Sequence, residues 1–272
     1  PEMKNFSDTL FNKGHGLFYA GGVLGAEVAR EMTSNTLKRL NLGSEGDLEL
    51  DYSVLKLKAA KEAALRQIPV EHSDSSAVLY VQGDSDSLQE RARVAVLDAM
   101  ISAPFYSDMR TEKKLGYVVG SRVAHRQRVP GLMFYIQSPV VSAQQLRTEI
   151  DGFIADFGKV IEGLSEEEIE RYRRSVLVNI EETPKSLAEL NARYRESLQL
   201  GFDSFDFRLQ LAAQVRSVSK ADLIAAYQRL LGPGSRALWV TTLDDGGKKS
   251  TAVGVDREVL RAESEGYYRY PQ

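Results

Sequence analysis

The stretch FYSDMRTEKKLGYVVGSRVAHRQRVPGLMFYIQS, residues 105–138, decides the fold. It predicts the end of a helix, an irregular connector and then two strands. The first strand is expected over 115–129, and a turn at Arg128–Gly131, because Pro followed by Gly reverses a chain. The second strand is expected over 132–138. Its apolar residues share one face at period two: Leu132, Phe134 and Ile136. A hairpin of this length predicts a sheet on which the neighbouring helices pack.

The residues before this stretch predict one more strand and the helix that leads into it. The strand is expected over 77–82. Ser87 and Glu90 have the spacing of a capping box, which opens a helix. That helix is apolar on most of its sides, so we expect it to be deeply buried. Pro104 is expected to end it.

The residues after the hairpin predict a block of helices and a closing strand. Helical spacing of apolar residues predicts five helices, four of which begin at a serine: Ser142, Ser165, Ser186 and Ser219. The closing strand is expected over 236–243. Strands in two groups, with helices collected between them, predict an α+β fold: an antiparallel sheet with helices packed on one face.

The first part of the chain predicts a different organisation. Residues 1–60 are expected to be the C-terminal end of a preceding αβ domain, because their elements cannot bury themselves alone. Those elements are a strand over 17–23, a helix over 26–41 and a strand over 52–58. Residues 61–75 are polar and poorly patterned, which predicts a linker, and residues 76–272 are expected to form a complete C-terminal αβ domain. A chain that begins at Pro1 suggests a piece of something longer.

Composition excludes several classes of function. The 272 residues are 43% hydrophobic and 27% charged, as in soluble globular proteins. A net charge of -3 argues against a dedicated nucleic-acid binder. There is no cysteine, so structural disulfides and thiolate metal sites are excluded. No apolar run approaches the roughly 20 residues of a membrane span. The compartment stays open between periplasm and cytoplasm.

One family resemblance rests on the residues around the hairpin. Arg110-Thr111-Glu112 precedes Leu115-Gly116-Tyr117, and the hairpin ends in Gly131-Leu132 and Ile136-Gln137-Ser138. This resembles the last domain of the pitrilysin/insulysin family of zinc metallopeptidases, where R-T-E-x-x-L-G-Y is followed by a hairpin ending in G-L-x-F-x-I-Q-S. Lys113 and Lys114 depart from that pattern, since relatives tend to have Glu and Gln there.

The resemblance implies a fold and an organisation. The family is built from four similar αβ domains of the LuxS/MPP-like kind, two in each half of a clamshell. The match covers roughly residues 75–272 as the fourth domain and extends more faintly over residues 1–60 as the end of the third.

The histidines bear on the zinc chemistry of that family. Its peptidases carry an inverted H-x-x-E-H helix that holds zinc and activates water. None of His15, His72 and His125 has Glu at i+3 or His at i+4. We therefore expect this chain to bind no zinc and to be inactive alone. The resemblance implies that the parent enzyme carries Zn in its N-terminal half.

The resemblance also implies roles for two residues. In relatives, the Arg and Tyr that match Arg110 and Tyr117 reach across the chamber to the zinc site. Tyr117 would assist catalysis by donating to the oxyanion, and both residues would bind substrate. Gly116 would let a substrate or the opposite half approach the backbone closely. The alternative is structural: Arg110 pairs with Asp108 or Glu112, and Tyr117 is a strand core residue.

These observations favour one function and leave two rivals. The favoured one is the non-catalytic C-terminal portion of a zinc-dependent endopeptidase, which completes the substrate chamber. Its partners would be the N-terminal half of the same peptidase and a peptide substrate, with no nucleic acid and no membrane. The first rival is a catalytically silent scaffold or interaction subunit of the same family. The second is a polyanion binder built on the basic run Arg122–Arg128.

Overall fold

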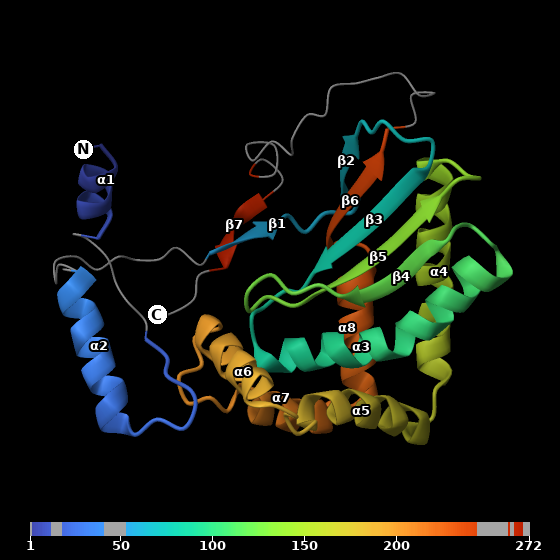
Figure 1. Ribbon diagram of the computed structural model, residues 1–272. Coiled ribbons are helices and arrows are strands. Elements are labelled where there is room, and N and C mark those ends of the chain that lie inside the picture. The colour runs from blue at the N-terminus through green and yellow to red at the C-terminus, as the bar shows by residue number, and fades with distance from the viewer. Residues whose placement is uncertain (1, 12–17, 41–52, 244–260, 262–263, 269–272) are drawn as a thin grey trace. The chain divides into compact units, whose positions relative to one another are not determined.

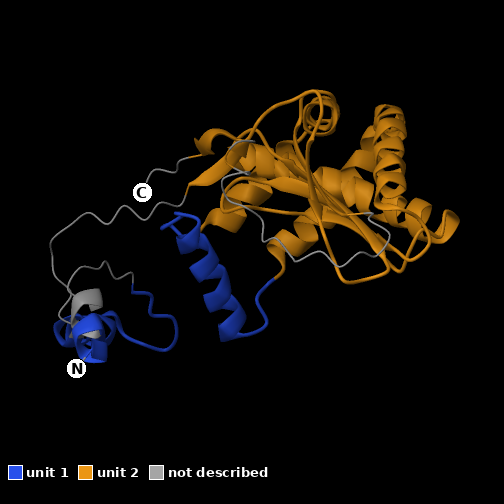
Figure 2. Ribbon diagram, turned by 90° about the horizontal axis from the view of Figure 1, so that it is seen from above, with its two compact units in different colours: residues 1–52, 183–205 blue, residues 53–182, 206–272 orange. Residues whose placement is uncertain are grey.

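The computed structural model describes residues 2–11, 18–40, 53–243, 261 and 264–268. The chain divides into two compact units, shown in Figure 2. Unit 1 comprises residues 1–52 and 183–205, and unit 2 comprises residues 53–182 and 206–272. None of the helices within the described ranges is long and apolar enough to cross a membrane.

A five-stranded sheet is the centre of unit 2 (Figure 1). Its strands are β2 (Ala64–Ile68), β3 (Ser75–Gln82), β4 (Val118–Val123), β5 (Gly131–Ser138) and β6 (Arg236–Thr242). They lie in the order β2-β6-β3-β5-β4, and every neighbouring pair is antiparallel except β2 with β6. The α+β fold with a mainly antiparallel sheet is therefore confirmed.

Helices lie on one face of this sheet. Those that pack on it are α3 (Leu88–Tyr106), α4 (Ala143–Gly163) and α8 (Lys220–Leu231), while α5 (Glu166–Glu181) and α7 (Phe207–Ser217) pack on α3. Alternate strand residues point into this helical layer and are buried: Ala77, Leu79, Val81, Leu132, Phe134, Ile136, Ala237 and Trp239. The ring of Phe105 in α3 lies 5.2 Å from that of Phe134 and 5.1 Å from that of Phe153 in α4. Aromatic edge-to-face contacts thus join the sheet to both helices.

The helix α3 is buried on most of its circumference, as its composition predicts. Its fully covered side chains are Val94, Val96, Leu97, Met100, Ile101 and Phe105. The sheet lies on one side of it, and α5 and α7 lie on the other (Figure 1). Serine side chains cap the helices as expected, because Ser87, Ser142, Ser165, Ser186 and Ser219 each accept the backbone N–H three residues on.

A second, two-stranded sheet joins β1 (Val54–Leu57) to β7 (Ser264–Tyr268) in antiparallel pairing. Side chains attach it to the main sheet. The amide of Gln82 accepts from the backbone N–H of Leu57 at 2.9 Å and donates to the carbonyl of Leu55 at 2.9 Å. The hydroxyl of Tyr268 donates to the carbonyl of Gly83 at 2.8 Å.

Unit 1 contains α1 (Glu2–Phe11), α2 (Ala26–Leu40) and α6 (Leu187–Gln199). Its contacts centre on Tyr19, whose hydroxyl donates to Asn191 at 2.7 Å and whose ring lies 6.2 Å from those of Tyr194 and Phe205. With α6 included, the five helices expected after the hairpin are all present.

Several expected elements differ from the structure. Residues 18–23 form no strand, and residue 17 lies outside the described residues. The expected linker 61–75 contains β2, which pairs with β6 throughout its length. Its sequence ALRQI lacks a clear alternation, so the pairing itself defines the strand. The boundaries of 1–60, 61–75 and 76–272 otherwise remain a prediction.

The hairpin is shorter than expected, and its turn is displaced. The first strand ends at Val123, and the chain reverses between Arg126 and Val129, whose backbones exchange hydrogen bonds of 2.9 and 3.0 Å. Gln127 has a φ of 53° in this turn. Pro130 and Gly131 instead enter β5, and the carbonyl of Pro130 accepts from Gly83 at 2.8 Å.

Pro104 does not end α3. The helix continues through it to Tyr106 because the flanking Ile101 and Phe105 are packed in the core, although a proline removes its own N–H from the ladder and crowds the carbonyl four residues earlier. The N–H of Ser107 reaches the carbonyls of Ala103 and Pro104, and the chain then widens into a π-helical turn.

Candidate functional site

The π-helical turn η1 (Ser107–Glu112) carries the R-T-E segment. The backbone N–H of Lys113 donates to the carbonyl of Asp108 at 2.9 Å, five residues earlier, and that of Leu115 donates to Met109 at 3.0 Å. Short π-helical turns are frequent at functional sites, because the wider turn changes the direction of the side chains it carries. An irregular connector was expected here from the sequence.

Arg110 holds the backbone that leads into β4. Its Nη1 donates to the carbonyl of Gly116 at 3.2 Å and to the carbonyl of Tyr117. Its guanidinium lies 4.3 Å from the ring centroid of Tyr117 and 5.8 Å from that of Tyr106. Arg110 therefore fixes Tyr117 twice, through the main chain and through a cation–π contact.

Tyr117 lies at the entry to β4 with 82% of its surface exposed. The described residues provide no hydrogen-bond partner for its hydroxyl, which can therefore donate to a group outside this chain. The alternative in which Tyr117 is a strand core residue is wrong. So is the alternative for Arg110, whose hydrogen bonds go to carbonyls and not to Asp108 or Glu112.

Lys113, which departs from the family pattern, ties this turn to the helical layer. Its Nζ lies 2.9 Å from a carboxylate oxygen of Asp108 and 3.0 Å from one of Glu149 in α4. The next residue, Lys114, has a φ of 53° and ends the turn. Glu149 was not among the predicted site residues, because its position in a distant helix leaves no local signal in the sequence.

The structure explains the glycine at position 116 by packing within this chain, and not by the approach of a substrate or the opposite half. A Cβ at this position would lie 1.8 Å from the carbonyl oxygen of Gln137 in β5. The space is therefore taken by the chain's own strand and not left for a substrate or another half. Any larger residue would push the Tyr117 segment away from the sheet.

The basic run Arg122–Arg128 does not form one cationic surface. Arg122 lies 6.0 Å from the ring of Tyr135, and Arg126 lies 5.5 Å from the ring of Tyr80. Arg128 approaches the carboxylate of Asp86 at 3.6 Å. Each arginine has its own partner on a different strand or loop, so the run offers no continuous phosphate-binding surface.

The described residues do not fit a zinc ion. They contain no group of three His, Cys, Asp or Glu side chains that could hold a metal. Burial, together with the positive charge of Arg91, lowers the pKa of His125 to about 3. The same cation would repel a metal ion there. His72 is exposed and bonded to the backbone of Asp74, and His15 lies outside the described residues.

Comparisons with known proteins support the family resemblance that the residues around Tyr117 carry. Residues 96–195 match the family model described as PQQ synthase PqqF-like, C-terminal lobe domain 4. A nardilysin-like protein of Arabidopsis thaliana is 32% identical over 162 residues, which is 57% of this chain and 16% of that protein. The chain is thus similar to the C-terminal part of the M16 peptidases, the pitrilysin/insulysin family.

Solved structures share the fold. A crystal structure of pitrilysin superposes with a TM-score of 0.74 at 20% identity, covering 86% of this chain and 25% of that one. The M16 peptidase inactive domain from Pseudomonas fluorescens gives a TM-score of 0.57 at 16% identity, with 80% and 51% covered. The chain therefore spans only a fraction of the peptidases that it resembles.

Proposed function

We propose that this chain completes the substrate chamber of a zinc-dependent endopeptidase whose zinc site lies in a different part of the protein. The observation that carries the proposal is the pair Arg110 and Tyr117. A tyrosine that is 82% exposed, yet held by an arginine through its carbonyl and its ring, is pre-positioned for a group outside this chain.

The chemistry of the pair suits peptide hydrolysis. When water attacks a peptide carbonyl, negative charge develops on the carbonyl oxygen, and a rigidly held hydroxyl donor stabilises it. Tyr117 is the donor in this proposal. Arg110 keeps it in position, and its remaining N–H groups are available to the carbonyls of a bound peptide.

A complementation assay tests the proposal. The chain alone, a zinc-bearing N-terminal half of the same peptidase alone, and the two together are each mixed with a fluorogenic peptide. Cleavage should require both halves and stop when zinc is chelated. Cleavage by this chain alone, or full activity of the N-terminal half without it, would overturn the proposal.

A second candidate is a catalytically silent scaffold, which is favoured by the likeness to a domain described as an inactive M16 domain. The same assay separates the two. A scaffold with Arg110→Ala and Tyr117→Phe should restore as much cleavage as the unchanged chain, whereas a contributor to the active chamber should not.

A further inference from the structure

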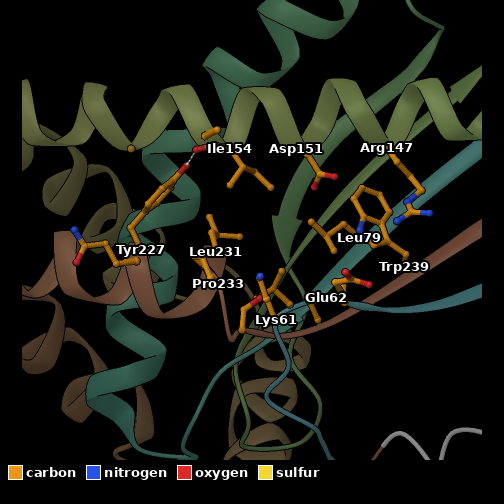
Figure 3. A pocket seen from close by; sticks show the side chains of 18 of the residues that line it. Lys61, Glu62, Leu79, Arg147, Asp151, Ile154, Tyr227, Leu231, Pro233 and Trp239 are labelled. Carbon is orange, nitrogen blue, oxygen red and sulfur yellow. Dashed lines mark hydrogen bonds between the residues drawn. The ribbon is translucent and has the colours of Figure 1, made fainter.

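A cavity of about 700 Å³ lies on the helical side of the sheet, between α4, α8 and the strands β2, β6 and β3 (Figure 3). Strand residues make its floor: Leu65, Leu79, Val81, Ala237 and Trp239. Ile154, Ala155 and Leu231 line it from the two helices. Both helices pack on β3, and β2 is the last strand on this side of the sheet. The cavity belongs entirely to unit 2 and is remote in sequence from the Tyr117 turn.

The size and lining of the cavity suit a small ligand. Ligand sites in proteins are typically pockets of roughly 300–1,000 Å³ with apolar walls and a few convergent polar groups. The charged groups here are two residues of each sign. Lys61 and Glu62 lie on one side, and Arg147 and Asp151 lie on α4 opposite them (Figure 3).

Arg147 differs from the other three because it is partly buried without an acidic partner. Its guanidinium lies 5.3 Å from the ring centroid of Trp239. Its Nε is buried and has no hydrogen-bond partner, and within the described residues Arg147 forms no ion pair. A buried N–H without a partner is destabilising, so an added acceptor at this position would be favourable.

Asp151 does not supply this acceptor. It follows Arg147 by one helical turn, yet it makes no ion pair with the guanidinium. Burial raises the pKa of the Asp151 carboxyl, and the nearby charge of Arg147 only partly offsets that rise. The cavity therefore has mainly apolar walls, and Arg147 is the partly buried cation at its margin.

We propose that this cavity binds a small amphiphilic carboxylic acid. Its apolar body would occupy the space between α4, α8 and the sheet, and its carboxylate would accept hydrogen bonds from the guanidinium of Arg147. A planar guanidinium pairs with a carboxylate through two parallel N–H···O bonds, which a neutral or cationic head group cannot accept in the same way. This site lies apart from the proposed peptide-binding function.

The single tryptophan of the chain provides a direct readout. Trp239 lines the cavity, so its fluorescence reports occupancy without a label. The full chain is titrated with octanoate, octanol and octylamine, with calorimetry supplying the affinities. Octanoate should saturate and bind at least about tenfold more tightly than octanol, and octylamine should bind more weakly still. Absence of saturable binding, or tighter binding of octylamine, would overturn the proposal.

Three variants separate the two parts of the site. Arg147→Gln should weaken octanoate at least about tenfold and leave octanol unchanged, because it removes the charge and keeps the length of the side chain. Ala155→Phe places a ring in the cavity and should abolish binding of both. Lys159→Gln also removes one cation from α4, but its side chain is 81% exposed and does not line the cavity, so it should change neither.

Circular dichroism melts establish that each variant is folded. Ala155 is exposed on α4, so a larger residue there should be compatible with folding. If Ala155→Phe nevertheless fails to fold, Arg147→Gln still tests whether the carboxylate of octanoate pairs with Arg147. Equal loss of octanoate and octanol in Arg147→Gln would refute the pairing with Arg147.

Discussion

The two ends of α3 use their charged side chains in opposite ways. At its N-terminal end Glu90 is only 3% exposed, and Arg229 donates to both of its carboxylate oxygens at 2.9 and 2.7 Å. Arg93 approaches the same carboxylate at 3.6 Å. At the C-terminal end the helix widens, and Arg110 bonds carbonyls and faces an exposed tyrosine.

The difference shows how one helix can serve stability and function. Charges at the N-terminal end are neutralised by one another inside the fold, and Arg229 also reaches Asp84 at 2.7 Å, which in turn meets Arg236 of β6 at 3.2 Å. At the C-terminal end the local hydrogen bonds orient a side chain whose polar atom faces outward. Substitutions at the first end should therefore change unfolding, and those at the second should change activity.

The largest effect is expected for Glu90→Gln. Removing one partner of a buried ion pair leaves the other charges uncompensated, which typically costs roughly 3–5 kcal/mol. We expect the free energy of unfolding to fall by about 3 kcal/mol, the lower end, because Arg229 keeps Asp84. Urea denaturation measures the change. Glu170→Gln is the control: Glu170 also meets two arginines, Arg173 and Arg174, but at the surface, and its loss should change little.

The next effect is on catalysis. In the assembled peptidase, Tyr117→Phe should lower kcat on the order of a hundredfold, because one oxyanion donor is lost, and should leave KM nearly unchanged. The melting temperature should not change, since the ring is exposed. Tyr106→Phe is the matched control, because Tyr106 is also near Arg110, at 5.8 Å, and should retain full kcat. A Tyr117→Phe enzyme with wild-type kcat would leave Tyr117 without a catalytic role.

A smaller, mixed effect is expected for Arg110→Ala. Loss of the contacts to the carbonyl and ring of Tyr117 should lower kcat about tenfold, and loss of a ground-state contact to the peptide should raise KM as well. Arg110→Lys should restore little, because an ammonium lacks the planar fork. Steady-state kinetics over a range of peptide concentrations separates the two constants. Full rescue by lysine would mean that only charge matters at this position.

Much of the fold could be predicted from local patterns. Spacing within a few residues predicts the buried face of β5, the helices that begin at serines and the burial of most of α3. The expected hairpin and its connection to a helical block fixed the fold class in the same way. The resemblance around Arg110 and Tyr117 located the candidate site.

The features that were missed depend on distant partners. The strand β2 exists because it pairs with β6, about 170 residues later. The ion pair that ties Lys113 to the helical layer requires Glu149 from α4. Glu90 was expected to complete a capping box, yet its carboxylate bonds Arg229, 139 residues away. Pro104 was expected to end a helix that instead continues to Tyr106, and the space expected beside Gly116 is taken by the carbonyl of Gln137 in β5. None of these partners can be read from a local window.

The smallest effect concerns Asp98, which lies between the two ends of α3. Unlike Glu90, it is partly buried without an arginine, and its Oδ1 has no hydrogen-bond partner. Burial raises the pKa of its carboxyl to about 6, and the backbone N–H of Val123 only partly offsets the rise. The two carboxylates of one helix thus test whether an arginine partner decides the cost of burial.

The sign of the pH dependence follows from that raised pKa. An unfolded chain releases the Asp98 proton near pH 4, whereas the folded protein keeps it until about pH 6, so the folded state binds more protons between these values. The contribution of Asp98 to the free energy of unfolding is therefore largest below about pH 4 and falls as the pH rises to about 6.

Asp98→Asn does not titrate, and should be more stable than the wild type by about 1 kcal/mol at pH 7.5, after allowance for solvent access. The difference should shrink as the pH falls toward 4. Urea unfolding of both proteins at pH 4, 5, 6 and 7.5 measures it, with Asp156→Asn as the control because its side chain is 81% exposed. A stability difference that stays constant over this range would show that the Asp98 carboxyl ionises alike in the folded and unfolded states, and burial without an arginine would then carry no cost at this position.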